Sequence, residues 1–338
     1  MIFNRPNAIL KVNQYASEGR PFLIICDFEA NNCIIEKLET IDSQVIKYKI
    51  NQKRNFSKSV TNTPNIILEK YPISFESYEK AFLIVKKNIF QGNSFLTNLT
   101  CQTPINLNIS LLEVFERSRA KYKLHIKDKF VCFSPEIFLK INDRGKLSLF
   151  PMKGTIDAAL PNAEQVILGD KKEFYEHITI VDLIRNDLSK VCEQVWVEKF
   201  RYIDKIKTFK NNELLQVSSQ VSGLLSNNWK EKLGSILFKM LPAGSILGAP
   251  KNKTLEIIRD TEKITYAAQF GELASNRGFY TGIMGIFDGE SFDSGVMIRF
   301  IEKTKNGLVF KSGGGITANS IAKNEYDEMI QKIYVPII

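Results

Sequence analysis

The sequence has few of the groups that build metal centres, disulfide frameworks or histidine-based active sites. It contains only two histidines, so any catalysis is expected to depend on lysine, glutamate and aspartate. Its five cysteines form no C-x-x-C pair, which argues against a structural zinc site or a disulfide framework and fits a reducing cytoplasm. These cysteines are scattered along the chain, at Cys26, Cys33, Cys101, Cys132 and Cys192.

Long apolar runs and nucleotide-binding motifs are also missing. No apolar stretch approaches the length of a membrane span, and the first residues lack the apolar segment and small-residue cleavage site of a signal peptide. Neither a phosphate-loop G-x-x-x-x-G-K-[ST] motif nor a G-x-G-x-x-G after a strand occurs. We therefore expect a cytoplasmic protein that is not attached to a membrane.

The composition is that of a globular protein with an excess of positive charge. Hydrophobic residues make up 44% and charged residues 25% of the sequence, as is ordinary for a globular protein. Its length of 338 residues is enough for one large domain or two ordinary ones. The net charge of +9 suits either nucleic acid or an anionic substrate. The basic run Lys47 to Lys58 forms no sustained basic helix face, so we interpret it as a solvated loop and expect no nucleic-acid partner.

Predicted strands and helices come in blocks rather than in strict alternation, which favours an α+β fold with antiparallel sheets. The first seventy residues read as strands, the first two joined by a turn at Glu29 to Asn32. The segments "KFVCFSPEIFLKI" and "GKLSLFPM" read as single strands joined by "NDRG", and "SGVMIRFIE" as another strand. A helix is predicted from Ser74 to Gly92, and three more begin at Glu173, after Pro250 and near Ala322.

Lys153 and two pairs of glutamates are the first candidates for chemistry. Lys153 follows an apolar run in "LFPMKGTI" and precedes Gly154, which would let another group approach the backbone closely. In "KEFYEH" and "NEYDEM", a spacing of three puts both glutamates on one helix face. Two facing pairs would offer the oxygen ligands that Mg²⁺ prefers, although the same spacing is common on solvated helices.

Glycine-rich turns and one arginine point to an anionic ligand. In "AGSILGAPK" and "SGGGIT", small residues would let backbone N–H groups approach an anion, or would simply form tight turns. Arg299 lies in the apolar segment "GVMIRFIE" and needs an anionic partner. That partner is either a structural carboxylate or a carboxylate of the substrate.

Taken in order along the chain, eight segments resemble the chorismate-utilising family. This family comprises the first components of aminodeoxychorismate and anthranilate synthases, with isochorismate and salicylate synthases. The matching segments cover about residues 75 to 335: "GNSFLTNLT", "FSPEIFLKI", "PMKGT", "EHITIVDLIRNDLSKV", "AGSILGAPKNKTLEII", "RGFYTGIMGIFD", "MIRF" and "SGGGITANSIAKNEYDEMIQK".

The resemblance implies the fold of anthranilate synthase component I, a layered α+β sandwich. Two β-rich halves would pack face to face, with helices outside and the catalytic cleft between the halves. We expect a strand-rich N-terminal part, residues 1–72, packed on a chorismate-binding catalytic domain, residues 73–338, as one integrated unit.

The resemblance also assigns roles around the substrate chorismate, a diacid. It implies that a magnesium ion is held or surrounded by Glu173, Glu176, Glu325 and Glu328. It implies that the substrate-binding shell contains Thr155, Tyr280, Arg299, Gly313, Gly314, Gly315 and Lys332. Arg299 would then pair with the enolpyruvyl carboxylate, in keeping with the basic charge of the chain.

In this family, the residue before Gly-Thr separates the branches. Anthranilate synthases carry alanine there, and aminodeoxychorismate synthases typically carry lysine, as Lys153 does. The implied mechanism is attack of Lys153 on ring C2, with Glu136 as the general acid that protonates the departing C4 hydroxyl. The attack needs an uncharged amine, so the site is expected to desolvate the lysine or place a cation beside it.

Several positions depart from the family pattern. Leu96 stands where isochorismate and salicylate synthases have a lysine that activates water, which argues against those branches. Gln216 replaces a histidine tied to the leaving group, so we expect a product that keeps its enolpyruvyl group. Phe150 and Leu247 also differ from the residues that are common in the family.

These features favour aminodeoxychorismate synthase component I, with anthranilate synthase component I as the close alternative. No cysteine lies in a G-x-C-x-G-like amidotransferase motif. The resemblance therefore implies that ammonia, the second substrate, comes from a separate glutamine amidotransferase subunit. A basic nucleic-acid-binding protein is the alternative from another class, supported only by the net charge and the Lys47 to Lys58 run.

Overall fold

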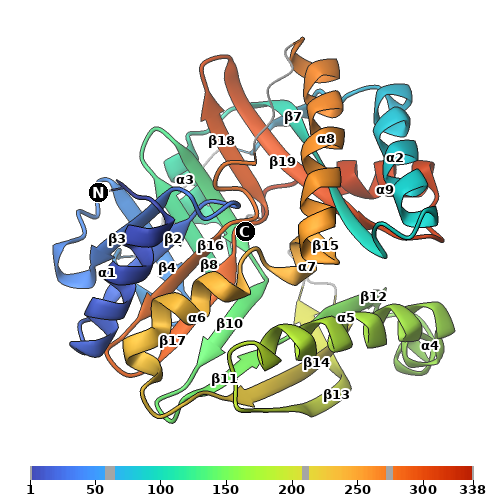
Figure 1. Cartoon of the computed structure of the whole chain (residues 1–338). Coiled ribbons are helices and arrows are strands. Elements are labelled where there is room, and N and C mark those ends of the chain that lie inside the picture. Colours follow the sequence, from blue (N-terminus) through green and yellow to red (C-terminus); the bar gives the residue numbers. More distant parts are fainter. Residues whose placement is uncertain (1, 58–64, 208–212, 272–276, 337–338) are drawn as a thin grey trace.

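Two large antiparallel sheets form the body of the protein, and helices cover their outer faces (Figure 1). The computed structural model describes residues 2–57, 65–207, 213–271 and 277–336. In the first sheet the strand order is β1-β3-β2-β16-β17-β10-β11-β14-β12, with β13 paired to β14. In the second it is β15-β7-β19-β18-β9-β8-β4-β5, with β6 paired to β7. The α+β layered fold expected from the sequence is confirmed.

The strands of the first sheet are β1 (Ile2–Phe3), β2 (Phe22–Cys26), β3 (Cys33–Lys37), β10 (Ile137–Ile141), β11 (Lys146–Leu149), β12 (Met152–Asp157), β13 (Gln194–Lys207), β14 (Glu213–Leu224), β16 (Ile283–Phe287) and β17 (Phe292–Val296). Those of the second are β4 (Ile46–Ile50), β5 (Lys53–Arg54), β6 (Leu68–Lys70), β7 (Leu96–Leu107), β8 (Tyr122–Ile126), β9 (Phe130–Ser134), β15 (Gly248–Ala249), β18 (Phe300–Thr304) and β19 (Gly307–Ile316). The helices are α1 (Arg5–Ser17), α2 (Phe75–Phe90), α3 (Leu111–Arg117), α4 (Ala163–Gly169), α5 (Lys171–Ser189), α6 (Leu233–Met240), α7 (Gly244–Leu247), α8 (Lys251–Phe270) and α9 (Ala322–Gln331).

Three large clusters make up most of the apolar core of the described residues. One cluster fills the space between the first sheet and helices α1, α5 and α6, and a second lies between the second sheet and helices α2, α3, α8 and α9. A third cluster joins the two sheets face to face and includes Leu23, Tyr122, Met284 and Phe300. None of the helices in the described part of the chain is long and apolar enough to cross a membrane.

The long helices largely follow the sequence prediction. Ser74 caps α2 by accepting a hydrogen bond from the backbone N–H of Ser77, and Gly92 follows the helix with φ +76°. The helices predicted after Glu173, Pro250 and Ala322 correspond to α5, α8 and α9. The turn predicted at Glu29 to Asn32 joins β2 to β3.

Residues 1–72 supply strands to both sheets, but the prediction that they contain only strands is wrong. Helix α1 covers Arg5–Ser17, and its buried face consists of the small residues Ala8, Val12 and Ala16. A stripe of small side chains has a weak helical hydrophobic signal, which is why the sequence did not reveal it. The helix packs on α6 and the 3₁₀ turn that precedes it.

The basic run Lys47 to Lys58 is not simply a solvated loop. It begins inside β4, which pairs with β8 and buries Ile46, Tyr48 and Ile50, while Lys47 and Lys49 alternate on the other side. Lys58 lies outside the described residues.

Two segments predicted as single strands cross from one sheet to the other. "KFVCFSPEIFLKI" is broken between β9 and β10, and "SGVMIRFIE" between β17 and β18. Pro135 has no N–H to donate, and Arg299 adopts a left-handed conformation with φ +53°, so neither segment continues as a straight strand. "GKLSLFPM" is likewise divided, between β11 and β12 at Phe150 and Pro151.

The two crossings lie side by side. The backbone N–H of Phe133 donates to the carbonyl of Arg299 (3.2 Å), and the N–H of Val296 donates to the carbonyl of Glu136 (3.1 Å). The crossings thus place Glu136 and Arg299 together where the two sheets meet.

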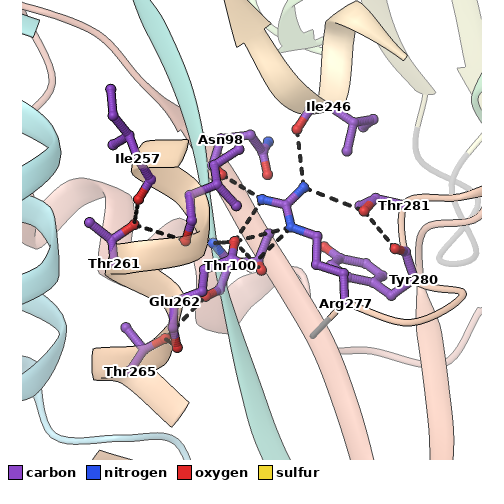
Figure 2. Close-up of polar contacts among 11 residues, drawn as sticks. Asn98, Thr100, Ile246, Ile257, Thr261, Glu262, Thr265, Arg277, Tyr280 and Thr281 are labelled. Atoms are coloured by element: carbon purple, nitrogen blue, oxygen red, sulfur yellow. Dashed lines mark hydrogen bonds and ion pairs between the residues drawn. The ribbon is translucent and has the colours of Figure 1, made fainter. Parts of the chain in front are cut away.

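A buried ion pair links strand β7 of the second sheet to helices α7 and α8 (Figure 2). The Arg277 guanidinium donates to both carboxylate oxygens of Glu262 on α8, with distances of 2.6 to 3.1 Å, and both side chains are almost fully buried. Its remaining donors reach the carbonyls of Asn98 on β7 (2.7 Å) and Ile246 on α7 (3.3 Å). Glu262 also accepts from the Thr100 hydroxyl and N–H, so both charges are extensively hydrogen-bonded.

Replacing Arg277 by Met should destabilise the fold strongly, because it leaves the Glu262 carboxylate buried without its charge partner. We expect a loss of about 3–5 kcal/mol in the free energy of unfolding, measured by urea denaturation. The matched control is Lys303→Met, which breaks the exposed pair between Lys303 and Asp128 and should cost no more than about 1 kcal/mol. Equal losses in the two variants would contradict the importance of the buried pair.

Candidate active site

A cavity of about 740 Å³ lies between the two sheets. Its walls come from the first sheet at Phe138 and Met152, from the second at Leu96 and Asn98, and from helices α5, α7 and α9. All thirteen residues given a role from the sequence line it: Glu136, Lys153, Thr155, Glu173, Glu176, Tyr280, Arg299, Gly313, Gly314, Gly315, Glu325, Glu328 and Lys332. The fold therefore brings distant segments into one polar site, and their individual roles remain predictions.

Lys153 projects from β12 into the cavity beside α5. Its Nζ lies 3.1 Å from Oε2 of Glu176, and both side chains are mostly buried. The structure thus places an anion beside Lys153, where the sequence analysis expected desolvation or a neighbouring cation.

Gly154 has a conformational and a steric reason to be glycine. Its φ is +78°, a region that residues with a Cβ rarely adopt. A Cβ at this position would lie 3.3 Å from Oε2 of Glu173 and 3.5 Å from Ile167. The close approach that the sequence suggested for Gly154 is therefore made by a candidate metal-binding carboxylate.

Glu136 lies at the crossing from β9 to β10, at the wall of the cavity. Burial raises the pKa of its carboxyl group, against the lowering effects of a hydrogen bond from Ser245 and the positive charges of Arg299 and Lys332. The Ser245 hydroxyl donates to Oε1 of Glu136 at 2.6 Å. A carboxyl group with a raised pKa holds its proton to higher pH, as a general acid requires.

Arg299 and Tyr280 form the part of the cavity nearest the crossing strands. Arg299 makes no ion pair with a carboxylate among the described residues, and its buried Nε has no hydrogen-bond partner there. Its guanidinium lies 5.2 Å from the centre of the Tyr334 ring. Its positive charge also acts on the nearby carboxyl group of Glu136 and lowers the pKa of that group.

The four glutamates come from two helices on different sides of the cavity. Glu173 and Glu176 are on α5, and Glu325 and Glu328 are on α9. Lys332 pairs with Glu328 at 2.7 Å and also donates to the carbonyl of Gly313 at 2.9 Å. Burial raises the pKa of Glu325, and the charge of Glu328 adds to this effect.

The donor set fits magnesium in its chemistry. Within the described ranges, no three acidic or histidine side chains come together as a preformed metal cluster. Mg²⁺ commonly binds one or two carboxylates and takes its other oxygens from water and substrate, so facing carboxylates in an open cavity suit it. Gly314 leaves room for this arrangement, because a Cβ there would lie 3.2 Å from Oε2 of Glu325.

The three glycines of β19 also serve strand packing. A Cβ on Gly313 would come within 2.4 Å of the Leu99 carbonyl on the neighbouring strand β7, and one on Gly315 within 3.0 Å of the Leu96 side chain. The glycine-rich segment that the sequence interpreted as an anion site or a turn is thus a strand pressed closely against β7.

Two residues at the cavity were missed as functional candidates. Asp187 is buried on α5 and pairs with Lys190 and with Lys251, each at 2.8 Å. Ser245 is on α7 and contacts Glu136. An aspartate beside the apolar stripe of α5 was a detectable signal, whereas a serine within "AGSILGAPK" resembles an ordinary turn residue.

Comparisons with known proteins agree with this geometry. A family model described as chorismate binding enzyme matches residues 11–337. A Haemophilus influenzae protein named "Uncharacterized PabA-like protein" is 46% identical over 97% of this chain and 96% of its own length. Aminodeoxychorismate synthase component 1 from Bacillus subtilis is 28% identical over 78% of this chain and 55% of its own length, so the chain spans about half of that relative.

Solved structures share the fold. The menaquinone-specific isochorismate synthase MenF of Escherichia coli superposes with a TM-score of 0.73 at 14% identity, covering 98% of this chain and 82% of that one. Anthranilate synthase component I of Streptococcus pneumoniae gives a TM-score of 0.61 at 24% identity, covering 79% and 58%. With a family match over nearly its whole length and a cavity to which all the family segments contribute, the chain belongs to the chorismate-binding enzymes.

Proposed function

We propose that this enzyme is an aminodeoxychorismate synthase component I, which converts chorismate and ammonia to 4-amino-4-deoxychorismate for para-aminobenzoate and folate synthesis. The observation that carries the proposal is Lys153, a lysine whose amino group faces the cavity beside Glu176. Sequence identity does not separate the branches, since an aminodeoxychorismate synthase and the yeast anthranilate synthase are both 28% identical to this chain.

In the proposed reaction, Lys153 acts as the nucleophile. It attacks ring C2 as a free amine, the ring double bonds shift, and the C4–O bond breaks. The attack requires an uncharged amine, and Glu176 is the carboxylate in contact with Nζ that can take up a proton from it.

Glu136 completes the proton balance. In its protonated form it gives a proton to the departing hydroxide, which leaves as water. Ammonia then bonds to C4, the double bonds shift back, and the C2–Nζ bond breaks to release Lys153 as a neutral amine. The proton lost by the new ammonium group returns to the Glu136 carboxylate. The raised pKa of Glu136 supports this role.

The dianionic substrate has a set of complementary groups in the cavity. Arg299, whose buried Nε has no hydrogen-bond partner in the described part of the chain, suits the enolpyruvyl carboxylate. Thr155, Tyr280, Lys332 and the Gly313–Gly315 strand complete the proposed substrate shell. A magnesium ion held or surrounded by Glu173, Glu176, Glu325 and Glu328 would neutralise the ring carboxylate when bound.

Ammonia is proposed to come from a separate glutamine amidotransferase subunit. All five cysteines lie within the described residues, and four of them are buried. Cys192 is half-buried, and burial raises its pKa to about 12. A glutaminase needs an accessible, activated thiolate, which these environments disfavour.

Two residues in the cavity support the proposed product over the alternatives. Leu96 presents an apolar side chain to the cavity wall, which cannot activate water as isochorismate and salicylate synthases require. Gln216, paired with Thr155 across β12 and β14, also lines the cavity and cannot shuttle a proton at neutral pH. We infer that the product keeps its enolpyruvyl group.

Replacing Lys153 by Ala should abolish formation of aminodeoxychorismate, since it removes the nucleophile. The assay uses purified protein with chorismate, magnesium and high ammonium at mildly alkaline pH, read by liquid chromatography and mass spectrometry. Lys146→Ala is the matched control. Lys146 is on β11, the strand that precedes β12 in sequence, and it pairs with Glu198; neither residue lines the cavity. Anthranilate with pyruvate, or isochorismate, from the unmodified enzyme would refute the proposed branch.

Replacing Arg299 by Met should weaken chorismate binding about 10- to 100-fold, the factor expected for a lost charge-assisted contact. Calorimetry with the Lys153→Ala background measures the dissociation constant without turnover. Arg185→Met serves as the control, since Arg185 is an exposed residue of α5 that pairs with Asp182. An unchanged dissociation constant in Arg299→Met would rule out the proposed carboxylate contact.

Replacing Glu325 by Gln should weaken Mg²⁺ binding at least about tenfold, since changes even to outer-shell partners of metal ligands have effects of that size. Calorimetric titration of Mg²⁺ into the chorismate complex of the Lys153→Ala variant provides the measurement. Glu290→Gln, in an exposed turn, is the control. Equal Mg²⁺ affinities in the two variants would remove Glu325 from the proposed metal site.

A further inference from the structure

Ser245 makes a short contact with the carboxyl group of Glu136. Its hydroxyl is 2.6 Å from Oε1, and it is the one side-chain hydrogen bond that the described residues give this carboxyl group. The contact joins α7 to the crossing between β9 and β10, elements 109 residues apart in sequence. Both residues line the cavity.

The short helix α7 is held in place independently of Glu136. On one side, the Arg277 guanidinium donates to the carbonyl of Ile246, and Figure 2 shows this contact as an extension of the Arg277–Glu262 pair. On the other side, Gly244 lies against α5, where a Cβ would come within 3.4 Å of Oδ2 of Asp187. Asp187 in turn binds Lys251 at the start of α8.

These anchors make α7 a rigid support for the serine hydroxyl. Arg277 and Asp187 have their own charge partners and are buried, so neither depends on a ligand for its position. A hydroxyl that is carried on this anchored backbone and bonded to Oε1 restricts the rotation of the glutamate side chain. It therefore favours a single orientation of the Glu136 carboxyl group.

We propose that Ser245 is a positioning residue for Glu136, with a hydroxyl that orients the carboxyl group toward the cavity for proton delivery. This inference rests on the proposed function for the role of Glu136, but the contact itself can be tested without turnover. Ser245 does not need to touch the substrate for this purpose.

The hydrogen bond from Ser245 shifts the pKa of Glu136 in a definite direction. A hydroxyl that donates to a carboxylate stabilises the ionised form and lowers its pKa. Arg299 and Lys332 act in the same direction, and burial acts against them. Removing the hydroxyl should therefore raise the pKa of Glu136 further, so that the protonated acid persists to higher pH.

The test is an infrared titration of the carboxyl band of the whole chain, with Glu136→Gln to assign the Glu136 signal. Ser245→Ala should move the titration midpoint upward by about one pH unit, the size expected for losing a hydrogen bond to a charged group. Ser245→Thr keeps the hydroxyl and should leave the midpoint close to that of the unmodified protein. Ser235→Ala, on the neighbouring helix α6, is the matched control.

A midpoint in Ser245→Ala equal to that of the unmodified protein would overturn the inference. In kinetics, Ser245→Ala should lower kcat about tenfold with little change in KM, and should move the alkaline limb of the pH–rate profile upward. A fall in kcat without a shift of that limb would assign Ser245 a merely structural role. If the unmodified enzyme forms no aminodeoxychorismate, the proposed function fails, and the infrared midpoint still decides the role of Ser245.

Discussion

The side-by-side crossing of two chain segments between the sheets is the constraint on which the site depends. Because β9 continues into β10 and β17 into β18, each sheet is covalently continuous with the other at the same place. Backbone hydrogen bonds at Glu136 and Arg299 keep the crossings together. A carboxyl group and a guanidinium group therefore face one cavity from neighbouring crossings, and backbone hydrogen bonds hold both positions.

The sequence predicted the site best where a single helix carries both the local pattern and the residues that line the cavity. The apolar stripe of α5 and the glutamates at spacing three on α5 and α9 were visible in the sequence, and the structure places both pairs at the cavity. The strand crossings were not predicted, because strand-like apolar residues continue on both sides of Pro135 and of Arg299, so each segment was read as one strand. Sheet membership is decided by long-range pairing, which single-sequence periodicity does not contain.

Other features escaped prediction because they arise only in three dimensions. The small buried residues of α1 form a packing face because α6 lies against this helix, and that contact is not visible in the sequence. The pairing of Lys153 with Glu176 joins positions whose geometry depends on how α5 lies against β12. The Arg277–Glu262 pair likewise brings three separate elements, β7, α7 and α8, to one guanidinium, so it could not be inferred from any one of them.

The adjacent positions 153 and 154 carry very different structural constraints. Gly154 is fixed by its left-handed backbone and by the nearby carboxylate of Glu173, so almost any replacement would disturb the frame of the site. The Lys153 side chain, by contrast, faces the cavity and contacts Glu176. Backbone geometry and side-chain chemistry are thus set at neighbouring positions of one strand. A substitution at 153 alters the groups that the cavity offers to a ligand, whereas a substitution at 154 alters the course of the strand that carries them.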